Sequence, residues 1–219
     1  PGTSLVPRVG WQPGTPVVWQ LEWPQFIRDK LVSSDNPTGT ITNSDLELAG
    51  GLLHLDCLAQ TFDTRERTIV SKGDNLNTTF WERKGSTTTD SAPAYLLRMF
   101  GIHQRFHRYV PRFDYLPGKS NPLADALSRS FDVPMPRLIS QLSHLLPQTV
   151  GCQVWTPPSA LVSAIISALL RKQSPRESLL VVPALPLNTI NSGSVSQMAG
   201  PRPLSRSLYG QSTILTSLQ

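Results

Sequence analysis

The sequence predicts an α/β fold with a mixed sheet flanked by helices. Two observations lead to this prediction. Strand-like and helix-like segments alternate in the order β-β-α-β-α-α-β-α over residues 1–131. From residue 132 onward the chain becomes rich in Pro, Ser and Leu and loses its periodicity. We therefore expect one domain at residues 1–131, followed by a largely irregular basic tail or linker at residues 132–219 with one short helix over 159–172.

The first half of the domain contains a predicted hairpin and a long helix. Two Val- and Trp-rich runs within residues 5–23 flank the turn sequence QPGTP, which favours two paired strands. A short helical stretch and a polar loop follow. Ser44 then begins the clearest helix, SDLELAGGLLHLDCLAQTF, whose leucines recur near helical spacing. Ser44 and Glu47 match the Ser-x-x-Glu capping box, so we expect them to cap this helix.

A short apolar strand, RTIVSKGDN, comes next and ends at Gly73 and Asp74. Two further helices are predicted, over residues 75–83 and 92–104.

The segment HRYVPRFDYLPG alternates well enough for a strand, and Pro111 within it indicates an edge position or a bulge. A last short helix begins at Asn121, which can cap it, with Pro122 in its first turn.

Charge and cysteine usage restrict the function classes. The formal net charge of +5 lies in residues 134–219, which carry six basic residues and one acid, so overall charge does not argue for nucleic-acid binding. The two cysteines are far apart, which excludes a disulfide framework and a cysteine-based zinc site and favours an intracellular, cytoplasmic or nuclear location. The longest apolar run, residues 161–170, is shorter than the roughly 20 residues that cross a bilayer, so we expect no membrane partner.

Three acids stand where they could form a site: Glu47 at a helix start, Asp74 at the end of a strand, and Asp125 in the last helix. Each also has an ordinary explanation. Glu47 would complete the capping box, Asp74 would cap the next helix, and Asp125 would be a solvated acid. If the three converge, their hard oxygen atoms suit Mg²⁺ and the hydrolysis of phosphodiesters.

Three segments of the chain resemble the ribonuclease H domains of retroelements. NSDLELAG resembles their Glu-Leu-x-Ala helix start, IVSKGDN their strand ending in an aspartate, and YLPGKSNPLADALSR their closing Pro-Gly-x-x-Asn-x-x-Ala-Asp-Ala-Leu-Ser-Arg string. The spacing of 27 residues from Glu47 to Asp74 and 51 from Asp74 to Asp125 fits the family. The resemblance covers residues 5–131 and is nearest to DIRS-type or gypsy-like retrotransposon polyproteins.

The resemblance implies a ribonuclease H-like domain behind a reverse transcriptase, cutting the RNA strand of RNA–DNA hybrids. It implies Glu47, Asp74 and Asp125 as catalytic residues and as ligands of Mg²⁺ or Mn²⁺. A transposase or integrase would instead need its acids in the order Asp–Asp–Glu.

The family uses four carboxylates, the first of them on its first strand. Here the predicted hairpin resembles the second and third strands, so we expect the first strand and its aspartate to lie before Pro1. Loss of that ligand implies impaired activity. The alternative function is therefore a non-catalytic remnant that acts as a nucleic-acid-binding or structural module.

Basic side chains are frequent between residues 83 and 112, where Asp90 is the only acid. In a hybrid-binding domain they would contact phosphates, and otherwise they form a solvated helix face and an exposed strand. The cations predicted to bind nucleic acid are Arg83, Lys84, Arg98, Arg105, Arg108 and Arg112, with His103 and His107 in the same stretch.

Overall fold

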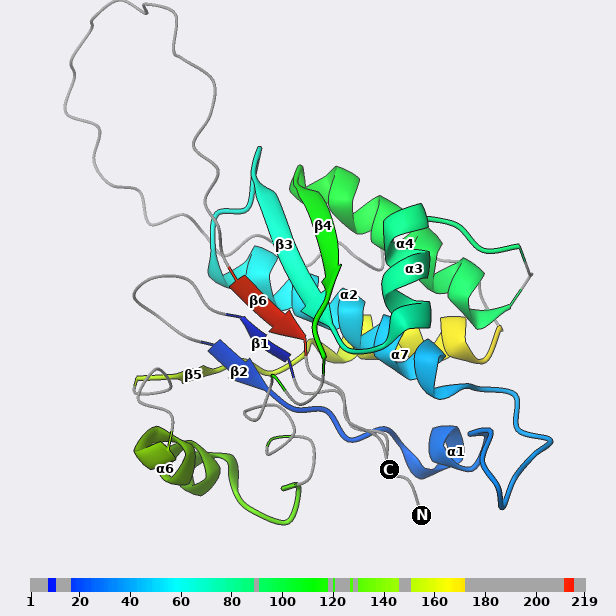
Figure 1. Cartoon of the computed structure of the whole chain (residues 1–219), viewed down its shortest axis with the longest axis horizontal. Helices are drawn as coiled ribbons and strands as arrows, with labels where there is room; N and C mark the ends of the chain where they lie inside the picture. Colours follow the sequence, from blue (N-terminus) through cyan, green and yellow to red (C-terminus); the bar gives the residue numbers. More distant parts are fainter. Residues whose placement is uncertain are drawn as a thin grey trace, which may run out of the picture.

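The structure, a computed structural model, describes residues 8–10, 17–88, 91–117, 120, 127, 130–145, 151–171 and 211–214. It confirms a mixed α/β fold, in which a six-stranded sheet has the order β4-β3-β6-β1-β2-β5 (Figure 1). The strands are β1 (Arg8–Gly10), β2 (Val17–Trp19), β3 (Thr68–Gly73), β4 (Val110–Tyr115), β5 (Gln153–Val154) and β6 (Gln211–Ile214).

The sheet joins segments from distant parts of the sequence. Strands β1 and β2 form the predicted antiparallel hairpin, and β3 runs parallel to β4. Strand β6 lies between these two pairs, antiparallel to β1 and parallel to β3. The position beside β1 for which we expected a strand from before Pro1 is therefore filled by residues 211–214.

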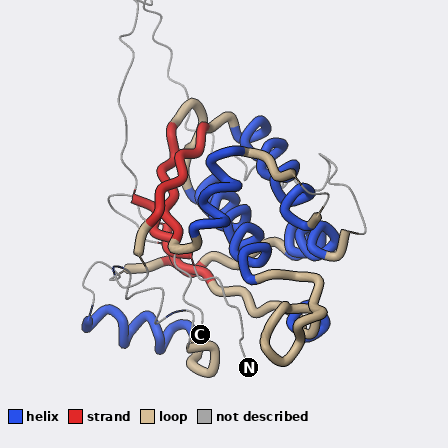
Figure 2. Tube along the Cα trace, turned by 45° about the vertical axis from the view of Figure 1, so that its right-hand side comes forward, coloured by secondary structure: helices blue, strands red, loops and turns tan. Residues whose placement is uncertain are grey.

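Four helices cover one face of the sheet: α2 (Asn43–Thr61), α3 (Leu76–Lys84), α4 (Ala92–His107) and α7 (Ser159–Leu169) (Figure 2). Helix α2 is buried on all sides from Ser44 to Leu58, because it lies against β1, α3, α4 and α7. Its buried polar side chains, among them Asp45 and Asp56, therefore depend on hydrogen-bond partners within the protein. Helix α4 has one buried stripe, which includes Leu96, Met99, Phe100 and His103.

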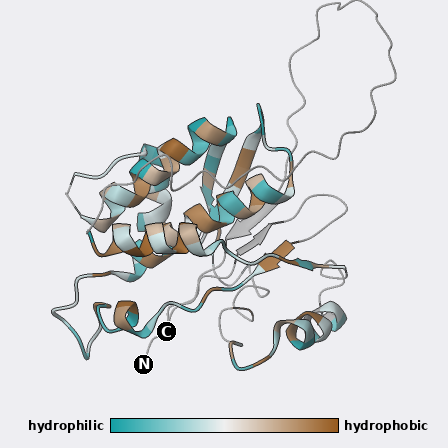
Figure 3. Ribbon diagram, turned by 180° about the vertical axis from the view of Figure 1, so that it is seen from behind, coloured by the Kyte–Doolittle hydropathy of each residue, from teal (hydrophilic) through white to brown (hydrophobic). Residues whose placement is uncertain are grey.

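The opposite face of β2 has its own small core. Val17 and Trp19 point into the main core, whereas Val18 packs with Leu127 and with Leu138 of α6 (Met135–Leu145). This alternation is the period of two that a strand imposes. A short helix that follows β2, α1 (Gln25–Arg28), buries Ile27 in the main core. Brown, hydrophobic stretches and teal, polar stretches alternate along the main helices and strands in Figure 3.

Most of the predicted elements up to residue 115 are present with small changes in their ends. Strand β3 ends at Gly73, as expected, and α4 is one turn longer than predicted. Strand β4 lies at the edge of the described sheet, so the edge position indicated by Pro111 is confirmed. The helix predicted from Asn121 lies outside the described residues, apart from Leu127.

The described parts of the region after residue 131 differ from the expected linker. Helix α6 was not predicted. Leu161, Ile165 and Leu169 of α7 belong to the same core as α2 and α4, and β6 is an inner strand. Helix α7 begins after Pro158 without a side-chain cap.

Candidate functional site

The first turn of α2 carries Glu47, and its geometry differs from the predicted capping box. Thr42 is the cap: its Oγ1 accepts a hydrogen bond from the Asp45 backbone N–H at 3.2 Å, and Asp45 Oδ2 accepts one from the Thr42 N–H at 2.7 Å. The predicted Ser44–Glu47 box is therefore wrong, because the helix begins two residues earlier. Glu47 is 3% exposed, and Asn43 Nδ2 donates a hydrogen bond of 2.7 Å to its Oε1.

Burial also affects the neighbouring acid, Asp45. It raises the pKa of Asp45 above its ordinary value of 3.8, although the hydrogen bonds from Thr42 and the charge of Arg171 act in the opposite direction. The start of α2 is thus an enclosed place in which a carboxylate charge is costly without a partner.

The end of β3 meets the start of α2. Asn75, directly after Asp74, caps α3 by accepting from the Thr78 backbone N–H at 3.1 Å. Its Nδ2 also donates to Ser44 Oγ at 3.1 Å, and Thr78 Oγ1 donates to the Ser44 carbonyl at the same distance. Asn75 and not Asp74 is therefore the cap, so the ordinary explanation for Asp74 is wrong. The segments that carry Glu47 and Asp74 lie at one end of the sheet, and Asp125 lies outside the described residues.

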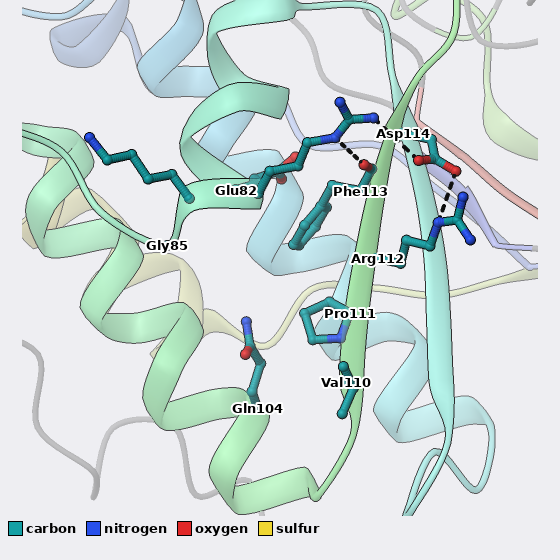
Figure 4. A pocket seen from close by; sticks show the side chains of 10 residues that line it. Glu82, Gly85, Gln104, Val110, Pro111, Arg112, Phe113 and Asp114 are labelled. Carbon is teal, nitrogen blue, oxygen red and sulfur yellow. Dashed lines mark hydrogen bonds and ion pairs between the residues drawn. The ribbon is translucent and has the colours of Figure 1, made fainter.

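A cleft of about 490 Å³ opens between the end of α3, the last turn of α4 and strand β4. Val110, Pro111, Arg112, Phe113 and Asp114 form one wall along β4, and Gln104 and Gly85 face them (Figure 4). Three of the predicted nucleic-acid-binding cations, Arg83, Lys84 and Arg112, line this cleft.

Two of these cations are held by β4. Arg83 Nε donates to the Phe113 carbonyl at 2.6 Å, and its Nη2 lies 3.3 Å from Asp114 Oδ1. Arg112 Nε lies 3.5 Å from the other oxygen of Asp114. Lys84 is exposed, with its Nζ 5.8 Å from the centre of the Phe80 ring. The cleft therefore presents three cations, two of which pair with Asp114, and this acid offsets part of their charge.

The other three predicted cations lie outside the residues that line the cleft. Arg98 and Arg105 are exposed on α4, and Arg98 stacks 5.7 Å from the Tyr95 ring centre. Arg108 ends α4 in a left-handed conformation and pairs with Glu66. The predicted set is therefore divided between the cleft and neighbouring surface.

Of the two histidines in the basic stretch, His103 is buried and cannot contact a phosphate, whereas His107 is partly exposed. His103 is 0% exposed, with Nδ1 2.7 Å from Tyr109 Oη and Nε2 3.1 Å from Oδ1 of Asp56 on α2. The ring of His107 lies 4.3 Å from that of His103, centre to centre. Burial, followed by the nearby charge of His103, lowers the pKa of His107 to about 4.

Our reading of the sequence missed this cluster of Asp56, His103 and His107. Its local signal was the His-x-x-x-His spacing, which places both rings on one face of a helix. Asp56 lies 47 residues before His103, so the sequence alone did not indicate its partner.

Comparisons with protein-family models, with curated proteins and with solved structures found no match to this chain. Among the residues that the structure describes, no helix has the length and apolar character needed to cross a membrane.

Proposed function

We propose that residues 1–131, completed by β6, form a ribonuclease H-like domain of a retrotransposon polyprotein that binds RNA–DNA hybrids. The observation that carries this proposal is the contact between Ser44 and Asn75. It brings the helix turn with Glu47 against the strand end with Asp74, although the two acids are 27 residues apart in the sequence. Two of the three segments that resemble the family thus meet at one end of the sheet.

The sheet supports the same proposal. The strands that resemble the family's second and third strands, β1 and β2, form an antiparallel pair. The strand that ends before Asp74 pairs in parallel with β4, which gives the mixed sheet that the resemblance implies. A strand is also present on the free side of β1, where the family's first strand is expected.

The acids offer hard oxygen atoms, the ligands that Mg²⁺ and Mn²⁺ prefer. Glu47 and Asp74, together with Asp125, would hold such an ion, which when bound activates water and stabilises the leaving oxygen of a phosphodiester. Asn43 orients the Glu47 carboxylate by its hydrogen bond of 2.7 Å. The reverse transcriptase part of the same polyprotein would supply the hybrid.

A second candidate function rests on β6. Its residues, Gln-Ser-Thr-Ile, include no carboxylate, although they occupy the strand position from which the family's first acid would come. Three acids hold two metals less firmly than four do, so hydrolysis would be slow or absent. In that case the domain is a non-catalytic remnant that binds nucleic acid through the cleft and the neighbouring arginines.

Binding and cleavage of a labelled RNA–DNA hybrid test both candidates. We expect the affinity to fall as salt rises, and Lys84→Ala and Arg98→Ala each to reduce the slope of log affinity against log salt by about one. Arg137→Ala is the matched control, because this exposed arginine lies on α6, away from α3 and α4 (Figure 1).

Cleavage in Mg²⁺ separates the two candidates. Slow cleavage that Asp74→Asn abolishes would support the nuclease, and binding without cleavage would select the remnant. A chain that neither binds nor cuts the hybrid would contradict both. Cleavage that Asp74→Asn leaves unchanged would remove Asp74 from the site and with it the proposed nuclease.

A further inference from the structure

The cluster of Asp56, His103 and His107 has the geometry of a metal site, and it does not depend on the proposed function. One ligand atom from each residue lies within 4.8 Å of the other two. Asp56 comes from the second half of α2, and the histidines are one turn apart near the end of α4. Two packed helices therefore direct three donor groups to one point. Asp56 lies nine residues after Glu47 on α2, which corresponds to about 13 Å along the helix, so the cluster is separate from the candidate acids.

Hydrogen bonds to surrounding residues already orient the donors. Gln60 Nε2 donates to Asp56 Oδ2 at 2.6 Å, and Trp155 Nε1 donates to Gln60 Oε1 at 3.2 Å. Oδ1 of Asp56 is thereby turned toward Nε2 of His103. On its other side, His103 Nδ1 has the hydroxyl of Tyr109 as partner. Partners of this kind fix the ring orientation of metal-bound histidines and hold carboxylate ligands in place.

Hydrogen bonding alone satisfies only part of the cluster. A metal-free arrangement exists for His103, in which Tyr109 donates to Nδ1 and Nε2–H donates to Asp56. It leaves His107 unused: its Nε2 is buried and has no hydrogen-bond partner among the described residues. A buried polar atom without a partner is destabilising. A cation bound by all three residues would give this nitrogen a partner.

We propose that Asp56, His103 and His107 bind one divalent transition metal of the zinc class, which fastens α4 to α2. Two imidazoles and one carboxylate suit Zn²⁺, Co²⁺ or Ni²⁺ better than Mg²⁺, which prefers oxygen ligands alone. Ligand bonds of about 2.0–2.2 Å require donors about 3.4 Å apart in a tetrahedron, so the most distant pair must approach by up to about 1.4 Å. His107 as a residue is only partly buried, which leaves its side chain freedom to rotate toward the other two donors.

Titration of the full chain, prepared without a histidine tag, tests the site. We expect one Zn²⁺ per chain by calorimetry and a rise in melting temperature with Zn²⁺ that His107→Ala reduces, whereas any effect of Mg²⁺ at the same concentration should not depend on His107. His107→Ala should weaken Zn²⁺ binding by about 100-fold, and it should fold because the residue is only partly buried. Tyr109→Phe keeps all three ligands and should weaken binding by about tenfold. Co²⁺ should give the visible absorption bands of a four-coordinate ion.

His144→Ala is the matched control, because this exposed histidine lies on α6 outside the cluster. It should bind Zn²⁺ like the unaltered chain. If the unaltered chain binds no Zn²⁺, the cluster is a hydrogen-bonded network only and the proposal is wrong. Equal affinity of the His107→Ala and unaltered chains, or a loss of binding in His144→Ala, would place the metal elsewhere and also overturn it.

Discussion

Replacing Ile165 by Ala measures how far helix α7 belongs to the folded domain. The side chain is 0% exposed and lies in the core shared by α7, α4 and α2. The substitution removes three carbon atoms, or about 2.4 kcal/mol of transfer free energy at about 0.8 kcal/mol each. The cavity left behind adds to this, because the neighbouring helices relax only in part. We expect the free energy of unfolding to fall by about 3–4 kcal/mol.

Urea unfolding followed by tryptophan fluorescence provides the assay. With a slope of about 2 kcal/mol per molar urea, the expected loss lowers the unfolding midpoint by about 1.5–2 M. Ser163→Ala on the exposed side of the same helix is the matched control and should stay within about 0.5 kcal/mol of the unaltered chain. If Ile165→Ala changes stability as little as Ser163→Ala does, α7 does not share the core, and residues 132–219 are the linker that composition predicts.

Two further predictions concern a glycine and a cysteine. A Cβ at Gly39 would lie 2.6 Å from the backbone of Leu31, so Gly39→Ala should lower the melting temperature. Gly101 lies in open space on α4, so Gly101→Ala should raise the free energy of unfolding by about 0.5–1 kcal/mol in the same melting experiment. An equal effect of the two substitutions would contradict the contact at Gly39. Burial raises the pKa of Cys152 from 9.0 to about 11, so a smaller fraction of the thiol is the reactive thiolate at pH 8. Iodoacetamide should therefore modify Cys152 about 100-fold more slowly in the folded chain than in the urea-unfolded chain. Equal rates by mass spectrometry would show that the thiol is not buried.

Local sequence patterns were sufficient to predict the helices and strands whose signals lie within a few neighbouring residues. The leucine spacing after Ser44 marked α2, and the apolar run before Gly73 marked β3. Pro111 indicated an edge strand because its nitrogen cannot donate to a sheet neighbour. The helix start was misplaced by two residues, because two overlapping capping patterns were present and the Thr42–Asp45 pair forms the box.

Long-range pairing was beyond these patterns. Nothing local in Gln-Ser-Thr-Ile indicates that β6 pairs with both β1 and β3, since register depends on partners far away in the sequence. Helix α7 is apolar on its own, but only the packing of α2 and α4 shows which of its residues are core. The candidate acids Glu47 and Asp74 were identified from their positions at element ends and from the resemblance to a family, whereas Asp56 and His103 become partners only through the packing of two helices.

The position of β6 also determines the order in which the chain can fold during synthesis. The ribosome releases β1 to β4 long before residues 211–214, so the facing edges of β1 and β3 first emerge with unpaired backbone groups. The sheet can close only when β6 pairs with β3, and this pairing closes a loop formed by residues 74–210. Closing so long a loop costs entropy and is slow. During that interval the two open edges can pair with other nascent chains, so production of this protein should depend strongly on the rate of translation and on chaperones.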